Sequence, residues 1–457
     1  MQRPQVSIIG GGFAGVEGAW AAAQRGCRVT LYEMRPERFT AAHRTSELAE
    51  LVCSNSFKSE LMTNASGVLK EEMRRLGSLI LPLADCHRVA AGEALAVDRE
   101  PFSRAVTANI ESHPHISVVR REITELPPER PLVVATGPLT SPPLAQALRA
   151  VTGEDALAFY DAVAPTLLAE SLDMSRIFRA SRSPRNGQPV ADEGDYLNCP
   201  LNREEFVEFW TALKDAETAP LHDFEAEAGS TPFFEMCVPV EELARRGPRT
   251  LCFGPMKPIG LSDPTTGRRP WAVCQLRQEN REGTLWGMVG FQTRLRWGEQ
   301  KRVFRMIPGL ESAEFIRYGV MHRNTYVNAP RVLGTGGEVI GQAGLFLAGQ
   351  ITGVEGYLES AAIGLLAGIN AARRVRGFPA CIPPRETVLG SLCHYLSASD
   401  PRHFAPMNSN WGIVSELDGT PIRDKRERAR QKGERALAAL DAWSAADGVL
   451  PEESTPA

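Results

Sequence analysis

The feature that most constrains this chain is a glycine-rich turn close to its N-terminus. The apolar run 6–9 stops at Gly10, and glycines follow in the spacing G-x-G-x-x-G before an alanine-rich segment, 18–24, that is typical of a helix. A strand, a tight turn and a helix in this order form the first unit of a Rossmann-type sheet. We therefore predict an α/β fold with a dinucleotide-binding domain built around this turn.

The glycines of such a unit have separate roles. Gly10 makes the turn, Gly12 lets the backbone approach a pyrophosphate, and Gly15 lets the helix pack closely on the strand. The free amide groups of the first helical turn and the helix dipole attract the phosphates. The cofactor-binding residues that we predict here are Gly10, Gly11, Gly12, Phe13, Ala14 and Gly15.

An acidic residue, Glu33, follows the second predicted strand, 28–32. It lies about 20 residues beyond the glycines, where a carboxylate can accept hydrogen bonds from both hydroxyls of an adenosine ribose. An ordinary glycine-rich turn is the alternative for an isolated motif. Strand, helix, second strand and acid together favour dinucleotide binding.

Two later turns complete the predicted nucleotide-binding domain. The strand 132–135 runs into a small-residue turn at Gly137, and the strand 345–348 runs into Gly349 and a further helix. A late strand, polar turn and helix bring a second helix N-terminus to FAD in one-domain flavoproteins. The usual residue after the glycine is Asp, whereas this chain has Gln350, so a surface turn is the alternative. We predict FAD as the cofactor and Gly137, Gly349, Gln350 and Gly353 as further binding residues.

The composition limits the size, location and partners of the protein. The 457 residues have room for two or three domains. A formal charge of −4 argues against indiscriminate coating of nucleic acid, so an RNA partner must be bound by a local basic face. Nine cysteines without CxxC pairs indicate neither a disulfide framework nor a zinc site, and we predict no metal. No apolar run reaches the ~18 residues that span a bilayer, so we expect a cytoplasmic protein without a membrane partner.

The composition changes near residue 156. Polar loops such as 181–195 follow, with few periodic helices apart from 203–214, and alternation in 271–276 and 285–292 favours strands. We predict a discontinuous Rossmann-type FAD-binding domain, 1–155 and 317–457, with a basic C-terminal helix, and an inserted mixed α+β domain, 156–316.

A polar, hydroxyl-rich run, 53–60, follows a predicted helix at 46–51. Small polar residues are typical of a loop, so we expect Cys53 to be accessible, with Lys58 placed to favour its thiolate. A loop cysteine without a function is the alternative.

These segments together resemble the TrmFO family of folate- and FAD-dependent tRNA (uracil-5-)-methyltransferases, relatives of the GidA tRNA-modifying flavoproteins. Only the glycine motif is generic. The segment 334–341 departs from the family, whose members usually have a longer, proline-containing stretch there, but it lies outside the motifs. The resemblance covers nearly the whole chain. The matching stretches are 10–15 with Glu33, 50–57, 94–99, 253–261, 275–278, 290–293, 318–325, 349–360 and 406–408.

The resemblance implies methylation of uridine 54 in the tRNA T loop. The carbon comes from 5,10-methylenetetrahydrofolate and the electrons come from NAD(P)H through FAD. The chain has no second G-x-G-x-x-G that opens a helix, so NAD(P)H has no predicted site of its own, and no protein partner is implied. Some relatives methylate 23S ribosomal RNA, which is one alternative. A GidA-like enzyme for wobble uridine and an RNA-binding protein that uses FAD only for structure are the others.

The predicted catalytic residues are Cys53, which lies in the stretch 50–57, and Cys237. A thiolate is a soft nucleophile that adds reversibly to C6 of uracil and so activates C5. We assign Cys237 to this addition and Cys53 to the flavin side, and the reverse assignment is the alternative. Lys58 and Lys257 are candidates to stabilise a thiolate.

The target uridine is normally stacked and paired, so the enzyme must extrude it at a cost of roughly a few kcal/mol. Phosphate contacts offset this cost. The segment 423–435 holds seven basic and three acidic residues, although a charged helical face is usually only solvated. The RNA-binding candidates are Lys301, Arg302, Arg305, Arg426 and Arg430.

Overall fold

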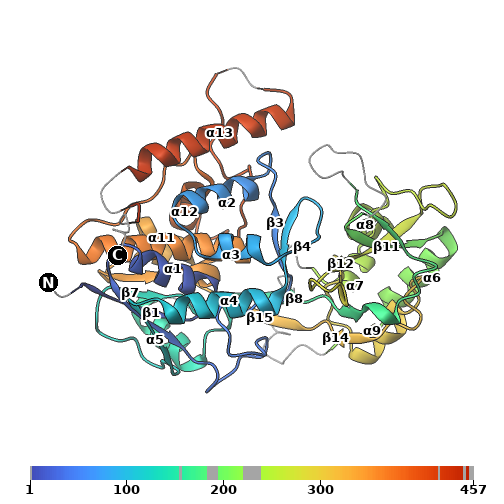
Figure 1. Ribbon diagram of the computed structural model, residues 1–457, viewed down its shortest axis with the longest axis horizontal. Coiled ribbons are helices and arrows are strands. Elements are labelled where there is room, and N and C mark those ends of the chain that lie inside the picture. Colours follow the sequence, from blue (N-terminus) through green and yellow to red (C-terminus); the bar gives the residue numbers. More distant parts are fainter. Residues whose placement is uncertain are drawn as a thin grey trace.

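The computed structural model describes residues 3–153, 157–182, 194–219, 238–419, 422–445 and 449–451. Figure 1 shows two lobes side by side, one formed by the N-terminal and C-terminal parts of the chain and the other by its middle part. Each lobe has its own hydrophobic core. The bounds of the inserted domain at 156 and 316 stay a prediction.

Five described strands form a parallel sheet in the first lobe, in the order β16-β7-β1-β2-β6. Their carboxyl ends meet at one edge, and the strand order reverses beside the central strand, which is where ligands of such sheets bind. This arrangement confirms the predicted α/β, Rossmann-type fold. The strands are β1 (Gln5–Ile9), β2 (Arg28–Glu33), β6 (Ile116–Arg120), β7 (Leu132–Val134) and β16 (Leu345–Leu347).

Two helices that are far apart in the sequence pack closely against each other. They are α1 (Phe13–Ala23) and α11 (Tyr357–Val375). A Cβ atom added at Gly364 would overlap the carbonyl oxygen of Ala14, and one at Gly368 would overlap that of Gly18. Because the two backbones touch, the N-terminus of α11 comes to the same edge of the sheet as the N-terminus of α1.

Further helices and a small antiparallel sheet surround this pair (Figure 1). The sheet contains β3 (Ser56–Ser59), β5 (Ala94–Val97) and β4 (Arg88–Val89). The other helices of this lobe are α2 (Ala65–Arg75), α3 (Ile80–Cys86), α4 (Arg99–Ser112), α5 (Pro142–Thr152), α10 (Ala329–Val332), α12 (Val388–Ala398) and α13 (Lys425–Ser444).

The second lobe is built on an antiparallel sheet in the order β10-β11-β12-β13-β9-β14. Its strands are β10 (Phe178–Ala180), β11 (Tyr196–Leu201), β12 (Ala272–Gln278), β13 (Leu285–Met288), β9 (Thr166–Leu168) and β14 (Phe315–Arg317). Four described helices cover it, α6 (Arg203–Asp215), α7 (Val240–Arg245), α8 (Pro248–Phe253) and α9 (Trp297–Phe304). Two strands, β8 (Leu157–Ala162) and β15 (Met321–Tyr326), pair where the chain passes between the lobes.

The helix predicted at 46–51 is wrong. The segment is irregular, and Ala49 has a φ of 48°. Its hydrogen bonds are not those of a helix. The Ala49 amide donates to the carbonyl of Gly11, and the Glu50 carboxylate accepts from the amide of Thr45. The following run was predicted as a loop, but its second half is the strand β3, with Phe57 buried. Within the described part of the chain, no helix is both long and apolar enough to cross a bilayer.

Candidate functional site

A cleft of about 150 Å³ lies at the carboxyl edge of the parallel sheet. It is formed by the turns that follow β1, β7 and β16, together with the loop that follows β2. Most of the predicted cofactor-binding residues line this cleft, namely Gly10, Gly11, Gly12, Phe13, Ala14, Glu33, Gly137, Gly349 and Gln350.

The glycine turn has the shape that a phosphate group requires. Gly10 has a φ of 105°, and a Cβ atom there would lie 2.5 Å from the carbonyl oxygen of Ala135. A Cβ atom on Gly12 would meet no described atom within 4 Å, so the backbone faces open space there. Gly12 caps α1 without a side-chain hydrogen bond. The amide groups of the first turn therefore open on the cleft and form an anion site. Gly15 lies outside the lining because it packs against the carbonyl of Gly10.

Glu33 is held at the end of β2 by hydrogen bonds on both carboxylate oxygens. The Gly11 amide donates to Oε2 at 2.8 Å, and the Arg35 side chain donates through Nε to Oε1 at 2.8 Å. Burial opposes ionisation, but the charge and hydrogen bonds of Arg35 outweigh it and hold the pKa of Glu33 below its usual range. The carboxylate is therefore ionised and oriented toward the glycine turn, as a ribose-binding acid must be.

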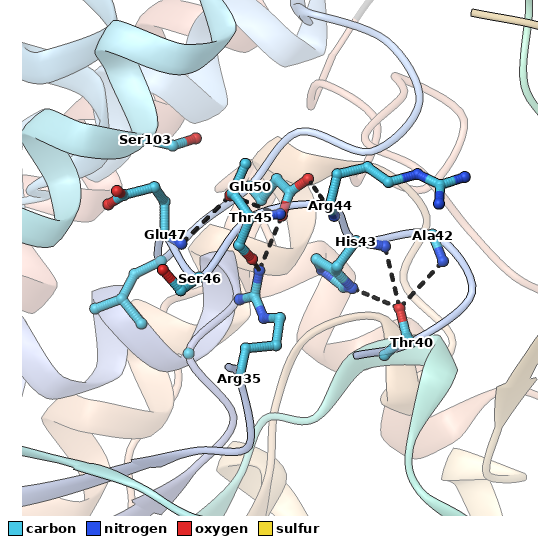
Figure 2. Close-up of polar contacts among 12 residues, drawn as sticks. Arg35, Thr40, Ala42, His43, Arg44, Thr45, Ser46, Glu47, Glu50 and Ser103 are labelled. Atoms are coloured by element: carbon cyan, nitrogen blue, oxygen red, sulfur yellow. Dashed lines mark hydrogen bonds and ion pairs between the residues drawn. The ribbon is translucent and has the colours of Figure 1, made fainter. Parts of the chain in front are cut away.

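The loop after β2 forms one wall of the cleft. Figure 2 shows the Arg35 guanidinium directed at Glu50 and Thr45, with an Arg35 Nη1 to Glu50 Oε2 distance of 3.0 Å. The Thr40 hydroxyl bonds the Nδ1 atom of His43 at 2.6 Å in the same figure. Thr40, His43 and Glu50 all line the cleft. The polar network thus fixes the loop beside the site without a regular helix.

The turn that follows β16 contacts the start of α1 through Gly349. Gly349 has a φ of 78°, and a Cβ atom there would lie 2.6 Å from the Cβ atom of Ala14. The Gln350 side-chain amide donates to Glu355 Oε2 at 2.6 Å. Gly353 does not line the cleft. Its φ is 91°, and a Cβ atom there would meet the Phe404 ring at 2.6 Å.

Cys53 lies next to two residues that line the cleft, Val52 and Tyr357. Its Sγ accepts a hydrogen bond from the Tyr357 hydroxyl at 3.1 Å, and its amide donates to that hydroxyl at 2.8 Å. The Tyr357 ring packs on Phe13 with a centroid distance of 4.7 Å and lines the cleft, as does Val52. Cys237, the other predicted catalytic residue, lies outside the described residues.

An arginine orders the backbone beside Cys53. The Arg99 guanidinium donates to the carbonyl of Leu51 at 2.8 Å and to that of Cys53 at 2.7 Å, and it pairs with Glu279 at 2.7 Å. Burial opposes its charge, but Glu279 outweighs burial and raises the pKa of Arg99. Lys58, predicted to favour the Cys53 thiolate, instead pairs with Glu359 at 2.6 Å.

The sequence did not single out Tyr357 or Arg99 as functional residues, although each begins a helix and lies within a matching stretch. The basic candidates occupy the surfaces of α9 and α13. Arg302 and Arg430 pair with glutamates of their own helices, and Arg305 donates to a main-chain carbonyl. Lys301, Arg302, Arg426 and Arg430 are exposed, and Arg305 is half-buried.

Comparison with known proteins gives consistent similarities. A family model described as glucose inhibited division protein A matches residues 5–379. The methylenetetrahydrofolate--tRNA-(uracil-5-)-methyltransferase TrmFO of Symbiobacterium thermophilum is 59% identical over 444 residues, which are 97% of this chain and 98% of that protein. The protein of the same name from Geobacter sulfurreducens is 57% identical over 440 residues, covering 96% and 99% of the two chains.

Solved structures share the fold. The chain resembles GidA of Aquifex aeolicus in its form II crystal with a TM-score of 0.68 and 17% identity, over 98% of this chain and 74% of that chain. The form I crystal gives a TM-score of 0.67. These values extend the likeness to the whole described arrangement of two lobes.

Proposed function

We propose that this chain, which belongs to the TrmFO family of methylenetetrahydrofolate--tRNA-(uracil-5-)-methyltransferases, methylates C5 of uridine 54 in the T loop of tRNA. The carbon comes from 5,10-methylenetetrahydrofolate and the electrons come from NAD(P)H through FAD. The observation that supports the proposal is the cleft, which the dinucleotide turn lines together with Tyr357, whose hydroxyl donates a hydrogen bond to the Cys53 sulfur.

The residues at the cleft suit FAD. The first-turn amide groups of α1 would hold the pyrophosphate, and Glu33 would accept the ribose hydroxyls. Gly349 and Gln350 line the same cleft, so the turn after β16 would add a second backbone contact. FAD, when bound, supplies the hydride chemistry that reduces the transferred carbon to a methyl group.

The two cysteines divide the remaining work in this proposal. The Cys237 thiolate adds to C6 of the everted uracil, which makes C5 nucleophilic toward the methylene carbon of the folate. After C5 has gained the carbon and lost its proton, the tetrahydrofolate nitrogen leaves from that carbon. Delivery of the hydride that bound FAD would supply then converts the exocyclic methylene to a methyl group, while the thiolate leaves C6 and the C5–C6 double bond of uracil is restored. Cys53 acts on the cleft side, where the Tyr357 hydroxyl orients its sulfur.

The proposal is tested by incubating the protein with tRNA that lacks 5-methyluridine, methylenetetrahydrofolate and NADPH, followed by mass spectrometry of the nucleosides. We expect 5-methyluridine at position 54. A parallel reaction on 23S ribosomal RNA separates the alternative substrate. Product on neither RNA would refute the methyltransferase proposal and would favour a flavin-binding protein that only binds RNA.

The cysteine roles are tested with single variants. Cys237→Ala should abolish product while FAD absorbance near 450 nm is retained, because the nucleophile is lost and the cofactor cleft is not. Cys86→Ala is the matched control, since Cys86 is exposed and lies outside the cleft lining. Full turnover by Cys237→Ala would remove this residue from the chemistry and would favour the reverse assignment.

A further inference from the structure

One face of the second lobe's sheet is turned toward the first lobe. Cross-strand neighbours form a row on it that runs through Tyr196, Arg277, Gly287, Thr166 and Arg317. The alternate residues of these strands build the hydrophobic core of the second lobe. Because side chains alternate between the two faces of a strand, Tyr196, Arg277, Gly287 and Thr166 face away from that core. Phe315 packs on the core, and a register shift between Phe315 and Arg317 brings Arg317 opposite Thr166 in this row.

The inner part of this row is occupied by contacts with the first lobe. Arg277 donates to Ser54 Oγ and to Asn55 Oδ1, both at 2.9 Å, and the Tyr196 hydroxyl donates to the carbonyl of Ala91 at 2.9 Å. These bonds fix the face of the sheet next to the segment that carries Cys53.

A paired carboxylate occupies the middle of the row. Gly287 has no side chain, and the space of its missing Cβ atom is filled by the Glu279 carboxylate. Glu279 in turn pairs with Arg99, whose guanidinium holds the carbonyl of Cys53. The two arginines here, Arg277 of the row and Arg99 of the first lobe, therefore both have hydrogen-bond or ion-pair partners.

Arg317, at the end of the row, differs from them. Its half-buried guanidinium makes no hydrogen bond or ion pair with any residue that the structure describes. The charged or ionisable groups around it are Arg99, Glu279, Tyr357 and Glu50. Burial and then the charge of Arg99 lower the pKa of Arg317, so the two nearby carboxylates do not fully compensate it. A partly desolvated guanidinium with unused donors is a site for an anion.

An aromatic stack begins at the next residue. The Tyr318 ring lies between Phe315 at 5.5 Å and Trp297 at 5.2 Å, with interplanar angles of 1° and 14°. The stack starts in the core and ends at Trp297, which is 62% exposed. The Lys301 Nζ lies 5.9 Å from the centre of the Tyr318 ring. An exposed ring that is held in place by a stack offers a flat surface to a nucleobase at little entropic cost.

We propose that Arg317 and Trp297, which are connected through Tyr318, form an RNA subsite in which Arg317 binds a backbone phosphate and Trp297 stacks on an unpaired base. The proposal rests on the proposed function and adds the residues that hold the RNA once the uridine is everted. A guanidinium beside a stacking platform is the combination by which proteins bind unstacked nucleotides. A folate carboxylate would use the arginine but would not need the exposed indole.

The test compares Arg317→Gln and Trp297→Ala with the wild-type FAD-loaded protein. We expect each variant to raise the KM for tRNA about tenfold and to leave the KM for methylenetetrahydrofolate unchanged. In direct tRNA binding, Arg317→Gln should also reduce the slope of log K against log salt by about 1, because one phosphate contact is lost. Trp297→Ala should weaken binding without changing this slope. A merely structural role of Arg317 would not change the salt slope.

Two residues of the same lobe provide matched controls. Arg176 is an exposed arginine that pairs with glutamates, and Trp271 is 50% exposed with the Arg203 guanidinium over its ring. Arg176→Gln and Trp271→Ala should leave both KM values unchanged. An unchanged KM for tRNA in Arg317→Gln, or a rise in the KM for the folate alone, would overturn the subsite. A wild-type protein that neither binds nor methylates tRNA would instead refute the proposed function.

Discussion

At the scale of single residues, the hydroxyl of Tyr357 connects the two halves of the candidate site. It accepts from the Cys53 amide and donates to the Cys53 sulfur, while its ring packs on Phe13 at the start of α1. Burial first, and then Cys53, raise the pKa of Tyr357 well above its usual value. The phenol therefore stays protonated and acts as a hydrogen-bond donor.

We predict that Tyr357→Phe slows alkylation of Cys53 by iodoacetamide about tenfold at neutral pH. The thiolate loses its O–H donor, and a hydrogen bond to an ion contributes about 1.5 kcal/mol or more. FAD content should not change, because the ring remains. The rate is followed by mass spectrometry of the Cys53 peptide, and the exposed Cys86 in the same sample is the internal control. Equal rates for Cys53 in both proteins would show that the hydroxyl does not activate it.

The sequence was informative about single residues where the backbone dictates their role. Gly10, Gly12 and Glu33 lie where the motif predicts them, since their roles depend on one strand, one turn and one helix. The ion pair of Lys58 with Glu359 was not predicted, because an ion pair forms with the nearest carboxylate in space. Glu359 is 301 residues away along the chain, and no local pattern indicates such a distance.

At the scale of elements, buried carboxylates on two helices cap the N-termini of two others. Glu17 of α1 accepts from the amides of Leu79 and Ile80 at the start of α3. Glu72 of α2 accepts from the amides of Val388 and Leu389 at 2.8 Å, at the start of α12. Burial raises the pKa of Glu17 to about 7 and that of Glu72 to about 8, against the lowering effect of these hydrogen bonds.

The raised pKa of Glu72 predicts a pH-dependent stability. The contribution of this group is fully present below the unfolded value of about 4.5 and is lost as pH rises through about 8. Glu72→Gln leaves one buried amide without an acceptor, so it should lower the free energy of unfolding by about 1–3 kcal/mol at pH 6. The deficit should shrink at pH 9, because Glu17 titrates in both proteins over this interval and only the wild-type protein also loses the contribution of Glu72. Urea unfolding at the two pH values measures both differences.

Glu71→Gln is the control for this prediction. Glu71 precedes Glu72 on the same helix but is partly exposed and pairs with Arg75 at 3.1 Å. Its replacement should change the free energy of unfolding by no more than about 0.5 kcal/mol, equally at both pH values. A deficit of Glu72→Gln that grows toward pH 9 would contradict the sign derived from the pKa.

Elements with a regular apolar pattern were predicted well from the sequence. The strands 28–32 and 132–135 and the helix 203–214 lie within one or two residues of β2, β7 and α6. The segment 46–51 was not predicted correctly. Ala49 donates to the backbone of Gly11 and Glu50 accepts from Thr45, and these hydrogen bonds outweigh a weak helical preference.

At the scale of the whole molecule, polar contacts join two separate cores. Arg277 bonds to Ser54 and Asn55, and Glu279 pairs with Arg99. The partners of each contact come from different lobes, so these bonds orient the second lobe against the segment of Cys53. This docking was not predicted, since the sequence indicates which strands exist but not which polar side chains meet across 222 residues.

These contacts predict how the molecule unfolds. The wild-type protein should melt in one calorimetric transition. Unfolding of one lobe alone removes one partner of the Arg99–Glu279 ion pair and leaves the other charge without its partner, at a cost of several kcal/mol. In Arg277→Ala/Glu279→Gln the coupling is removed, and the two cores should melt in two transitions. FAD at about 100 times its Kd stabilises the lobe that binds it by about 2.7 kcal/mol, so only one of the two transitions should move when FAD is added. A single transition that moves as a whole in the double variant would mean that apolar packing, and not these ion pairs and hydrogen bonds, joins the lobes.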